Sequence, residues 1–186
     1  EWIQNWIREN GNDETKVVIG ISGGKDSTVT AALLVKALGK DRVFGVMMPN
    51  GEQKDIGDSY KVVEVLDIDY AVVNIGPAYE ALTSSIQSAH DNMAEGPYNA
   101  AYQTNTPARI RMTTLYGIGA MLGNCRVVNT CNLSEDKMGY STFYGDSAGD
   151  FAPLSHLTTE EVIAIGDTLD LPMELTHKAP SDGMCG

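Results

Sequence analysis

Basic residues and cysteines are scarce in this chain. Its 186 residues include 13 Lys and Arg against 25 Asp and Glu, which gives a formal net charge of -12. Because a polyanion is bound by a basic face, this balance argues against tRNA or DNA as the main partner. The three cysteines lack metal-ligand spacing, so we interpret Cys125, Cys131 and Cys185 as small buried or loop residues of a protein in a reducing compartment.

Long apolar runs are also absent. No stretch reaches the length that spans a bilayer, and no signal peptide precedes the first predicted strand, so we expect a soluble, cytoplasmic protein without a membrane partner. The histidines His90, His156 and His177 have neither metal-ligand spacing nor a nucleophile pattern nearby, and we interpret them as surface residues. The chain therefore offers no Ser/His/Asp or Cys/His constellation for nucleophilic catalysis.

The length and the two ends indicate one domain that lacks residues at both termini. With 42% hydrophobic residues, the chain can bury one full core and is short for two, so we expect a single domain over residues 1–186. It begins inside an apolar helical stripe at residues 2–7 and stops in loop-like sequence at residues 181–186.

A glycine-rich run stands between an apolar, strand-like segment (16–21) and a helix-like stretch (28–38). It consists of Gly20, Ile21, Ser22, Gly23, Gly24, Lys25, Asp26 and Ser27. Consecutive glycines let the backbone approach an anion, the serines add hydroxyl donors, and the start of the helix presents unpaired N–H groups. The run therefore predicts a phosphate-binding loop, and the alternative is a glycine-rich turn without a ligand.

Asp26 is unusual in such a loop, because a carboxylate repels phosphate unless a cation lies between them. Magnesium is therefore implied. The run is not a Walker A loop, since Gly20 stands too close to Gly24-Lys25 and Asp26 occupies the place of the metal-binding hydroxyl residue. It resembles the SGGxDS signature of the PP-loop ATP pyrophosphatases, which split ATP between its α and β phosphates and adenylylate a substrate.

Short apolar runs alternate with helical stretches from residue 16 onward. This alternation is typical of βαβ units and predicts an α/β fold with one parallel sheet flanked by helices on both faces. Ligands of such sheets bind where the strands end. The predicted strands are residues 17–21, 43–48, 70–74 and 126–130, which directs attention to residues 22–27, 49–55 and 130–135.

Two later helices have recognisable starts. The polar stretch 90–106 is predicted to be a loop that ends where Thr106 caps a helix and Pro107 occupies its first turn. Thr158 and Glu161 form a predicted capping box for a last helix that runs to about Leu169.

Thr130 and Glu135 fall at the carboxyl end of the last predicted strand. Glu135 can complete a magnesium site with Asp26, because magnesium is commonly held by one or two carboxylates together with phosphate oxygens and water. Taken alone, a glutamate at this place is more often a solvated helix residue.

Arg109 and Arg111 are two residues apart on one predicted helix, about 200° around its axis, so they cannot easily bind the same anion. Arg111 shares a face with Leu115 and Ile118, which favours an aliphatic stem packed against the core or a subunit contact. Arg109 is the better anion ligand, and an exposed arginine without a ligand is the alternative. Asp150, in a glycine-punctuated loop, is either a site residue or a local backbone cap.

Together these residues resemble one family, the ammonia-dependent NAD synthetases. The resemblance rests on segments that follow one another in the family's order: residues 20–27, 49–55 and 108–112, Thr130 with Glu135, and residues 144–153. It implies an adenine nucleotide alpha hydrolase-like fold and the ATP-dependent amidation of deamido-NAD (nicotinic acid adenine dinucleotide) with ammonia.

The resemblance also implies roles for individual residues. ATP is expected to contact the run Gly20 to Ser27 together with Gln53, Thr130 and Ser181, and magnesium is expected to be held by Asp26 and Glu135. Arg109 and Asp150 are similar to residues that hold deamido-NAD. Because the family binds this substrate at a homodimer interface, Arg109 can serve the partner's site.

Three positions depart from the family's pattern. Phe143 stands where members often carry a basic substrate-binding residue, Thr159 where many have an ATP-binding lysine, and Met47 where an arginine is common. No glutaminase domain is seen in this sequence; the resemblance to the ammonia-dependent family implies ammonia as the nitrogen donor, and glutamine supplied through a separate partner is left open.

The expected reaction has two steps. The nicotinate carboxylate attacks the α phosphorus, pyrophosphate leaves, and ammonia then displaces AMP from the acyl adenylate. Such catalysis consists of positioning and charge neutralisation and needs no side-chain nucleophile. The alternatives are another PP-loop ligase that modifies or thiolates tRNA, which the acidic charge and the unpaired cysteines disfavour, and a non-catalytic ATP-binding module.

Overall fold

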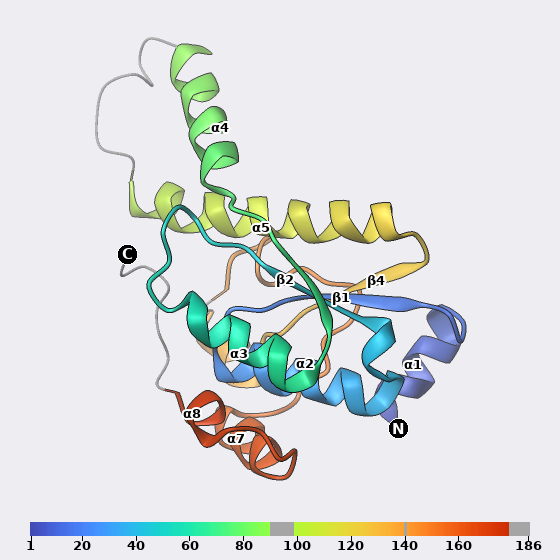
Figure 1. Cartoon of the computed structure of the whole chain (residues 1–186). Coiled ribbons are helices and arrows are strands. Elements are labelled where there is room, and N and C mark those ends of the chain that lie inside the picture. Colours follow the sequence, from blue (N-terminus) through green and yellow to red (C-terminus); the bar gives the residue numbers. More distant parts are fainter. Residues whose placement is uncertain (90–98, 140, 179–186) are drawn as a thin grey trace.

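The computed structural model describes residues 1–89, 99–139 and 141–178 and contains one parallel sheet (Figure 1). The strand order is β3-β2-β1-β4, and every neighbouring pair is parallel. The strands are β1 (Lys16–Gly20), β2 (Val43–Met47), β3 (Asp69–Val72) and β4 (Cys125–Val128). The predicted parallel sheet is confirmed, although each strand ends one or two residues earlier than predicted.

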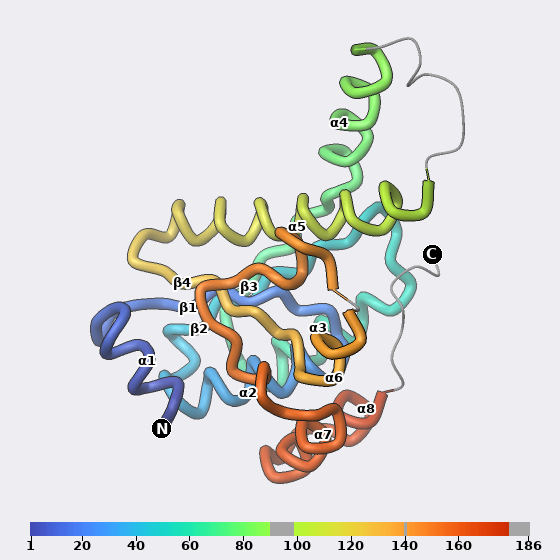
Figure 2. Tube along the Cα trace, turned by 180° about the vertical axis from the view of Figure 1, so that it is seen from behind, coloured from blue at the N-terminus to red at the C-terminus, as the bar shows by residue number. Residues whose placement is uncertain are grey.

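Helices cover both faces of the sheet, as predicted. Helices α1, α2 and α3 lie on one face and α5 crosses the other, while α7 and α8 pack on α2 (Figures 1 and 2). None of the helices in the described part of the chain is long and apolar enough to cross a membrane. The bounds are α1 (Trp2–Asn10), α2 (Lys25–Leu38), η1 (Lys40–Arg42), α3 (Ile56–Leu66), α4 (Gly76–Ala89), α5 (Ala100–Leu122), α6 (Leu133–Met138), α7 (Thr159–Asp167) and α8 (Met173–Thr176).

Strand β1 lies between β2 and β4 in the sheet, and its apolar side chains are buried on both faces. Val17 and Ile19 belong to the core that includes α1, α2 and α3, and both are fully buried. Val18 is equally buried, and alternation along a strand turns it to the face covered by α5. Near-continuous hydrophobicity is typical of a strand covered on both sides, and the buried side chains of β1 agree with this.

Helix α5 begins earlier than predicted. The sequence suggested a start at Thr106, whereas the helix runs from Ala100, with Pro107 inside it. The Asn99 side chain accepts a hydrogen bond from the Tyr102 amide (2.9 Å) and caps the helix. A proline within a helix removes one backbone hydrogen bond without ending the helix where tertiary contacts compensate, and Pro107 is buried. Only residues 99–106 of the predicted loop 90–106 are described, so the remainder cannot be compared.

Lys178 joins the end of the described chain to the start of α3. Its ammonium group donates to Asp55 (2.9 Å) and to Asp58 (2.8 Å). The hydrogen bond from Lys178 is the main cause of a lowered pKa for Asp55, and the hydrogen bond to Asp58 raises the pKa of Lys178. The lysine thus fixes the loop before α3 against the segment after α8.

We expect Lys178→Met to lower the free energy of unfolding by about 1 kcal/mol at pH 7, the upper end for partly exposed ion pairs. The change corresponds to roughly 2–4 °C in melting temperature. Because the folded-state pKa of Asp55 is lowered, this stabilisation is complete above the ordinary aspartate pKa of 3.8 and is lost as the pH falls through the lowered value. Thermal unfolding followed by circular dichroism from pH 7 down to about pH 2 tests both statements.

Lys61→Met is the matched control. Lys61 also joins α3 to α8, through Glu174 (2.9 Å), but both of these side chains are more than half exposed. It should change the melting temperature less than Lys178→Met does at pH 7. An equal loss in both variants, or a gap between wild type and Lys178→Met that persists at low pH, would contradict the assignment.

Candidate nucleotide and metal site

The phosphate loop leaves the central strand β1 and enters α2, as predicted. The two serines brace it: the Ser22 and Ser27 hydroxyls are 3.0 Å apart, and the Gly24 amide donates to Ser22 Oγ (3.2 Å). Gly23 has a φ of +76°, and a Cβ there would lie 2.8 Å from the Ser59 backbone nitrogen. Only glycine fits at this point, so the tight backbone path of the loop depends on Gly23.

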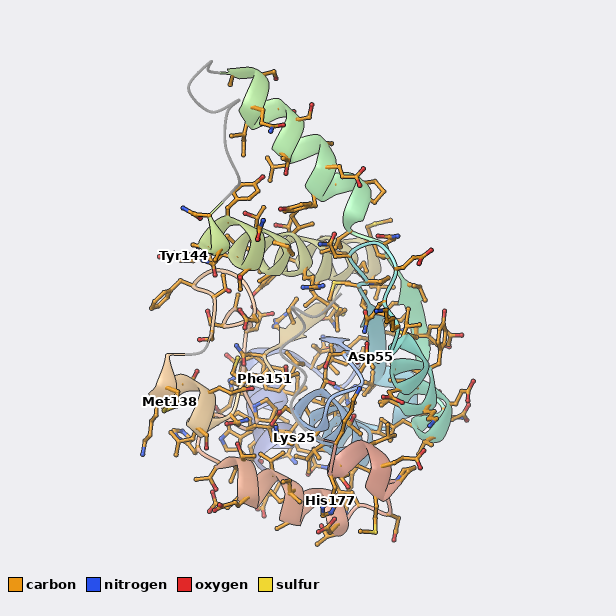
Figure 3. The ribbon with its side chains drawn as sticks, turned by 90° about the vertical axis from the view of Figure 1, so that its left-hand side faces the viewer. Lys25, Asp55, Met138, Tyr144, Phe151 and His177 are labelled. Carbon is orange, nitrogen blue, oxygen red and sulfur yellow. The ribbon has the colours of Figure 1, made fainter. Side chains whose placement is uncertain are left out.

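Asp26 lies in the first turn of α2 and has two partners. Its Oδ2 accepts from Lys25 Nζ (2.9 Å), and its Oδ1 accepts from Asn132 Nδ2 (2.9 Å). Lys25 is itself buried and belongs to the first turn of α2, where Figure 3 labels it. A carboxylate oxygen can accept more than one hydrogen bond, so both oxygens of Asp26 retain capacity for a further ligand.

Glu135 contacts the same residue as Asp26 does, Asn132, and comes from a different segment of the chain. It lies in the first turn of α6, directly after β4, and its Oε2 accepts from the Asn132 amide (3.1 Å). The Asn132 side chain accepts from the Ser134 and Glu135 amides, which completes a capping box. Asn132 therefore contacts both Asp26 and Glu135, and the structure brings the two predicted metal ligands together.

The electrostatics of this pair suit a divalent cation. Burial raises the pKa of Glu135, and the charge of Asp26 raises it further, while the hydrogen bond from the Asn132 backbone opposes the shift. A carboxylate whose ionised form is disfavoured in this way, as that of Glu135 is, would be stabilised by a nearby cation. No cluster of three or more His, Cys, Asp and Glu that could hold a metal occurs in the described ranges. Asp26 and Glu135 together supply two carboxylates, and magnesium is commonly held by one or two carboxylates with phosphate oxygens and water.

Thr130 and Gln53 border the loop at the ends of the strands on either side of β1. Thr130 is half-buried and follows β4. Gln53 lies between β2 and α3, and its amide donates to Asp55 Oδ1 (3.0 Å). Both are placed where the sequence located them, at the carboxyl edge of the sheet. Ser181 lies outside the described residues.

Arg109 and Arg111 point to different surroundings, as their spacing predicted. Arg109 is exposed, and its Nε donates to the Phe143 carbonyl (3.2 Å). Arg111 is half-buried, and its Nε donates to the Met48 carbonyl (3.0 Å) at the end of β2. Burial lowers the pKa of Arg111. The Arg111 stem thus packs inward, in agreement with its apolar neighbours in the sequence, and its head group supports the loop after β2.

Asp150 lies away from the phosphate loop. Its carboxylate accepts from the Val127 amide (2.7 Å) and from the Tyr116 hydroxyl (3.3 Å). It is therefore not the local backbone cap that the sequence left open, because Val127 belongs to β4. An open cavity of about 530 Å³, lined by residues that include Tyr116, Arg126 and Asp150, lies beside the start of β4. Pockets of this volume are large enough for a small-molecule ligand.

Arg109 and Asp150 of the same chain do not contact each other and have different partners. Tyr116, the partner of Asp150, follows Arg109 by about two turns of α5, on the same side of the helix and roughly 10 Å further along. The two residues predicted to hold the acceptor substrate are thus distributed along one side of α5. The loop that carries Tyr144 also lies beside α5, away from Lys25 (Figure 3).

The three departures from the family's pattern have different surroundings. Met47 is buried in β2, whereas Phe143 is 79% exposed. Thr159 opens α7, and its amide donates to Ser134 Oγ (3.2 Å). None of the three supplies a positive charge.

Sequence reasoning assigned no role to Asn132, which the structure places at the centre of the site. A signal was available: Asn132 and Glu135 have the spacing of a capping box, and a capped helix directly after a buried strand marks a turn at the carboxyl edge of the sheet.

Comparisons with known proteins agree with this arrangement. The model of the NAD synthase family matches residues 1–185. The NH(3)-dependent NAD(+) synthetase of Pyrococcus furiosus is 40% identical over 179 residues, which cover 96% of this chain and 65% of that protein. The chain thus spans just under two thirds of the length of this curated relative.

Solved structures show the same fold. An NMN synthetase from Francisella tularensis superposes with a TM-score of 0.84 at 35% identity, covering 98% of this chain and 72% of that one. An NH3-dependent NAD synthetase from Campylobacter jejuni, in complex with nitrate, gives a TM-score of 0.82 at 30% identity, covering 97% and 74%. The family model accounts for nearly every residue, and the chain belongs to the NAD synthase family.

Proposed function

We propose that this chain is the ATP-binding domain of an ammonia-dependent NAD synthetase and that residues 1–186 act as one unit. One observation carries the proposal: Asp26 and Glu135 both form a hydrogen bond with Asn132. The glycine-rich loop next to them is held by a contact between its two serine hydroxyls. Membership of the NAD synthase family and curated NH(3)-dependent relatives at about 40% identity support it. They do not favour a tRNA-modifying ligase or a non-catalytic ATP-binding module.

In the proposed reaction, the phosphate loop holds the pyrophosphate portion of ATP, with N–H groups of the α2 start directed at the anion. The nicotinate carboxylate of deamido-NAD attacks the α phosphorus, the bond to pyrophosphate breaks, and an acyl adenylate forms. Ammonia then attacks the activated carbonyl carbon and AMP leaves. Lys25 offsets the charge of Asp26 in the resting site. Asp26 and Glu135 would hold magnesium, which would supply charge neutralisation on the phosphates.

The acceptor contacts are part of the same proposal. Arg109 and Asp150 would bind deamido-NAD. Within one chain, Arg109 lies about two turns of α5 before Tyr116, the partner of Asp150. This separation supports a site completed by a second copy. The exposed apolar residues Tyr116, Met121 and Leu122 on the last turns of α5 are consistent with a homodimer contact there. Arg109 would then serve the partner's site.

A second acceptor is worth a direct comparison, since the similar Francisella tularensis structure is an NMN synthetase. Amidation of nicotinic acid mononucleotide uses the same chemistry on the same carboxylate and lacks only the adenylate half of the acceptor. Curated relatives at 36–40% identity are NAD synthetases, which favours the dinucleotide.

The defining experiment mixes the full-length protein with ATP, magnesium, ammonium and either deamido-NAD or nicotinic acid mononucleotide. We expect NAD, AMP and pyrophosphate in equal amounts, with kcat/KM higher for the dinucleotide. AMP and pyrophosphate without an amidated nicotinate, formed instead with another acid, would replace the proposal with a different PP-loop ligase.

Asp26→Asn should lower kcat by at least about 100-fold, the loss typical when a transition-state charge contact is removed. The amide keeps the size of the side chain, so circular dichroism and the melting temperature should stay close to those of the wild type. Asp136→Asn is the control, since Asp136 is exposed on α6 and should leave kcat unchanged. Near-normal turnover of Asp26→Asn would refute the metal assignment.

Arg109→Met should raise KM for deamido-NAD by about 10- to 100-fold, as expected when a charged hydrogen bond to substrate is lost. KM for ATP should change little, because Arg109 lies on α5 and not at the phosphate loop. Arg8→Met, on the exposed side of α1, controls for the loss of a surface charge. An increase confined to KM for ATP would place Arg109 at the nucleotide instead.

A further inference from the structure

Asn132 is fully buried between the two carboxylates of the site. Its side-chain nitrogen donates to Asp26 Oδ1 (2.9 Å), and its backbone nitrogen donates to Glu135 Oε2 (3.1 Å). Its side-chain oxygen accepts from the Ser134 amide (2.9 Å) and the Glu135 amide (3.1 Å). Each of these groups of Asn132 is therefore engaged, and two of the contacts reach the carboxylates.

These contacts restrict Asn132 to one rotamer. The side-chain oxygen is held by the start of α6, so the NH2 group must point toward α2, where it meets Asp26. Because the backbone of Asn132 also donates to Glu135, one residue contacts both carboxylates.

We propose that Asn132 is a positioning residue that holds Asp26 and Glu135 in the arrangement that binds the divalent cation of the ATP complex. The inference rests on the proposed function for the identity of the nucleotide, but the contacts themselves are independent of it. Groups that orient metal ligands commonly change metal affinity by about 10- to 100-fold when they are replaced.

A purely structural role, as the cap of α6, makes a different prediction. Serine is about as good a helix cap as asparagine, so Asn132→Ser would keep the capping contacts. The shorter side chain has no NH2 group and cannot link α6 to Asp26. Capping alone thus predicts a near-normal protein, whereas positioning predicts weaker cation binding.

Asn129 provides a matched control in the same loop. It is also a buried asparagine: its side-chain oxygen accepts from the Cys131 amide (2.7 Å), and its NH2 group donates to the Asp146 carbonyl (3.2 Å). Both of these partners lie outside the Asp26 and Glu135 pair. Asn129→Ser removes a comparable set of contacts and leaves the carboxylate link intact.

The experiment measures Mn²⁺ binding by electron paramagnetic resonance in the full-length protein, with α,β-methylene-ATP present. Mn²⁺ is used as the probe because, like magnesium, it prefers oxygen ligands. We expect Asn132→Ser to raise the Kd of Mn²⁺ by about 10-fold or more and Asn129→Ser to change it less than about 2-fold. Thermal unfolding should show that both variants are folded.

An unchanged Kd in folded Asn132→Ser would overturn the proposal, and so would an equal rise in Asn129→Ser. If Asn132→Ser does not fold, Asn132→Thr, which also caps a helix and also lacks the NH2 group, is measured in the same way with the same criterion. If the wild type binds Mn²⁺ with the analogue but amidates neither nicotinate acceptor, the proposed function fails while the role of Asn132 stands.

Discussion

The parallel pairing of β1 with β4 is the constraint on which the rest of the site depends. Ile19 in β1 is paired with Val128 in β4, although more than a hundred residues separate them in the chain. Parallel neighbours end at the same edge of a sheet, so the segments after the two strands must meet. One segment contributes the phosphate loop and Asp26, and the other contributes Thr130, Asn132 and the start of α6.

This pairing concentrates negative charge where a phosphate is to bind. Asp26 and Glu135 both contact Asn132 in a half-buried place, where burial and, after it, the charge of Asp26 raise the pKa of Glu135. Lys25 and Asn132 offset part of the negative charge through direct hydrogen bonds to Asp26. A divalent cation would offset the remaining negative charge, and a phosphate, which two bare carboxylates would repel, would then be attracted.

Local chemistry explains which predictions succeeded. The place of the glycine-rich loop between a strand and a helix, the capping box at Thr158 and the four strands depend on residues close together in the chain, so spacing and composition were enough to find them. The start of α5 was misplaced because proline in a helix is locally unfavourable, and burial of Pro107 with capping by Asn99 compensates for that cost. Asp150 could not be placed, since its partners Val127 and Tyr116 come from a strand and a helix far from it in sequence.

The sequence by itself predicted the kind of ligand: a glycine-rich loop with an internal aspartate before a helix indicates a phosphate and a cation, because these residues are neighbours in the chain. Tertiary structure alone decided how that aspartate is held. Asn132 meets Asp26 only because β4 lies next to β1, and hydrogen bonds act over about 3 Å, so the contact does not exist until the sheet has formed. The spacing of residues in a sequence reveals helix and strand periodicity. It does not reveal the distance between two loops that only the fold brings together.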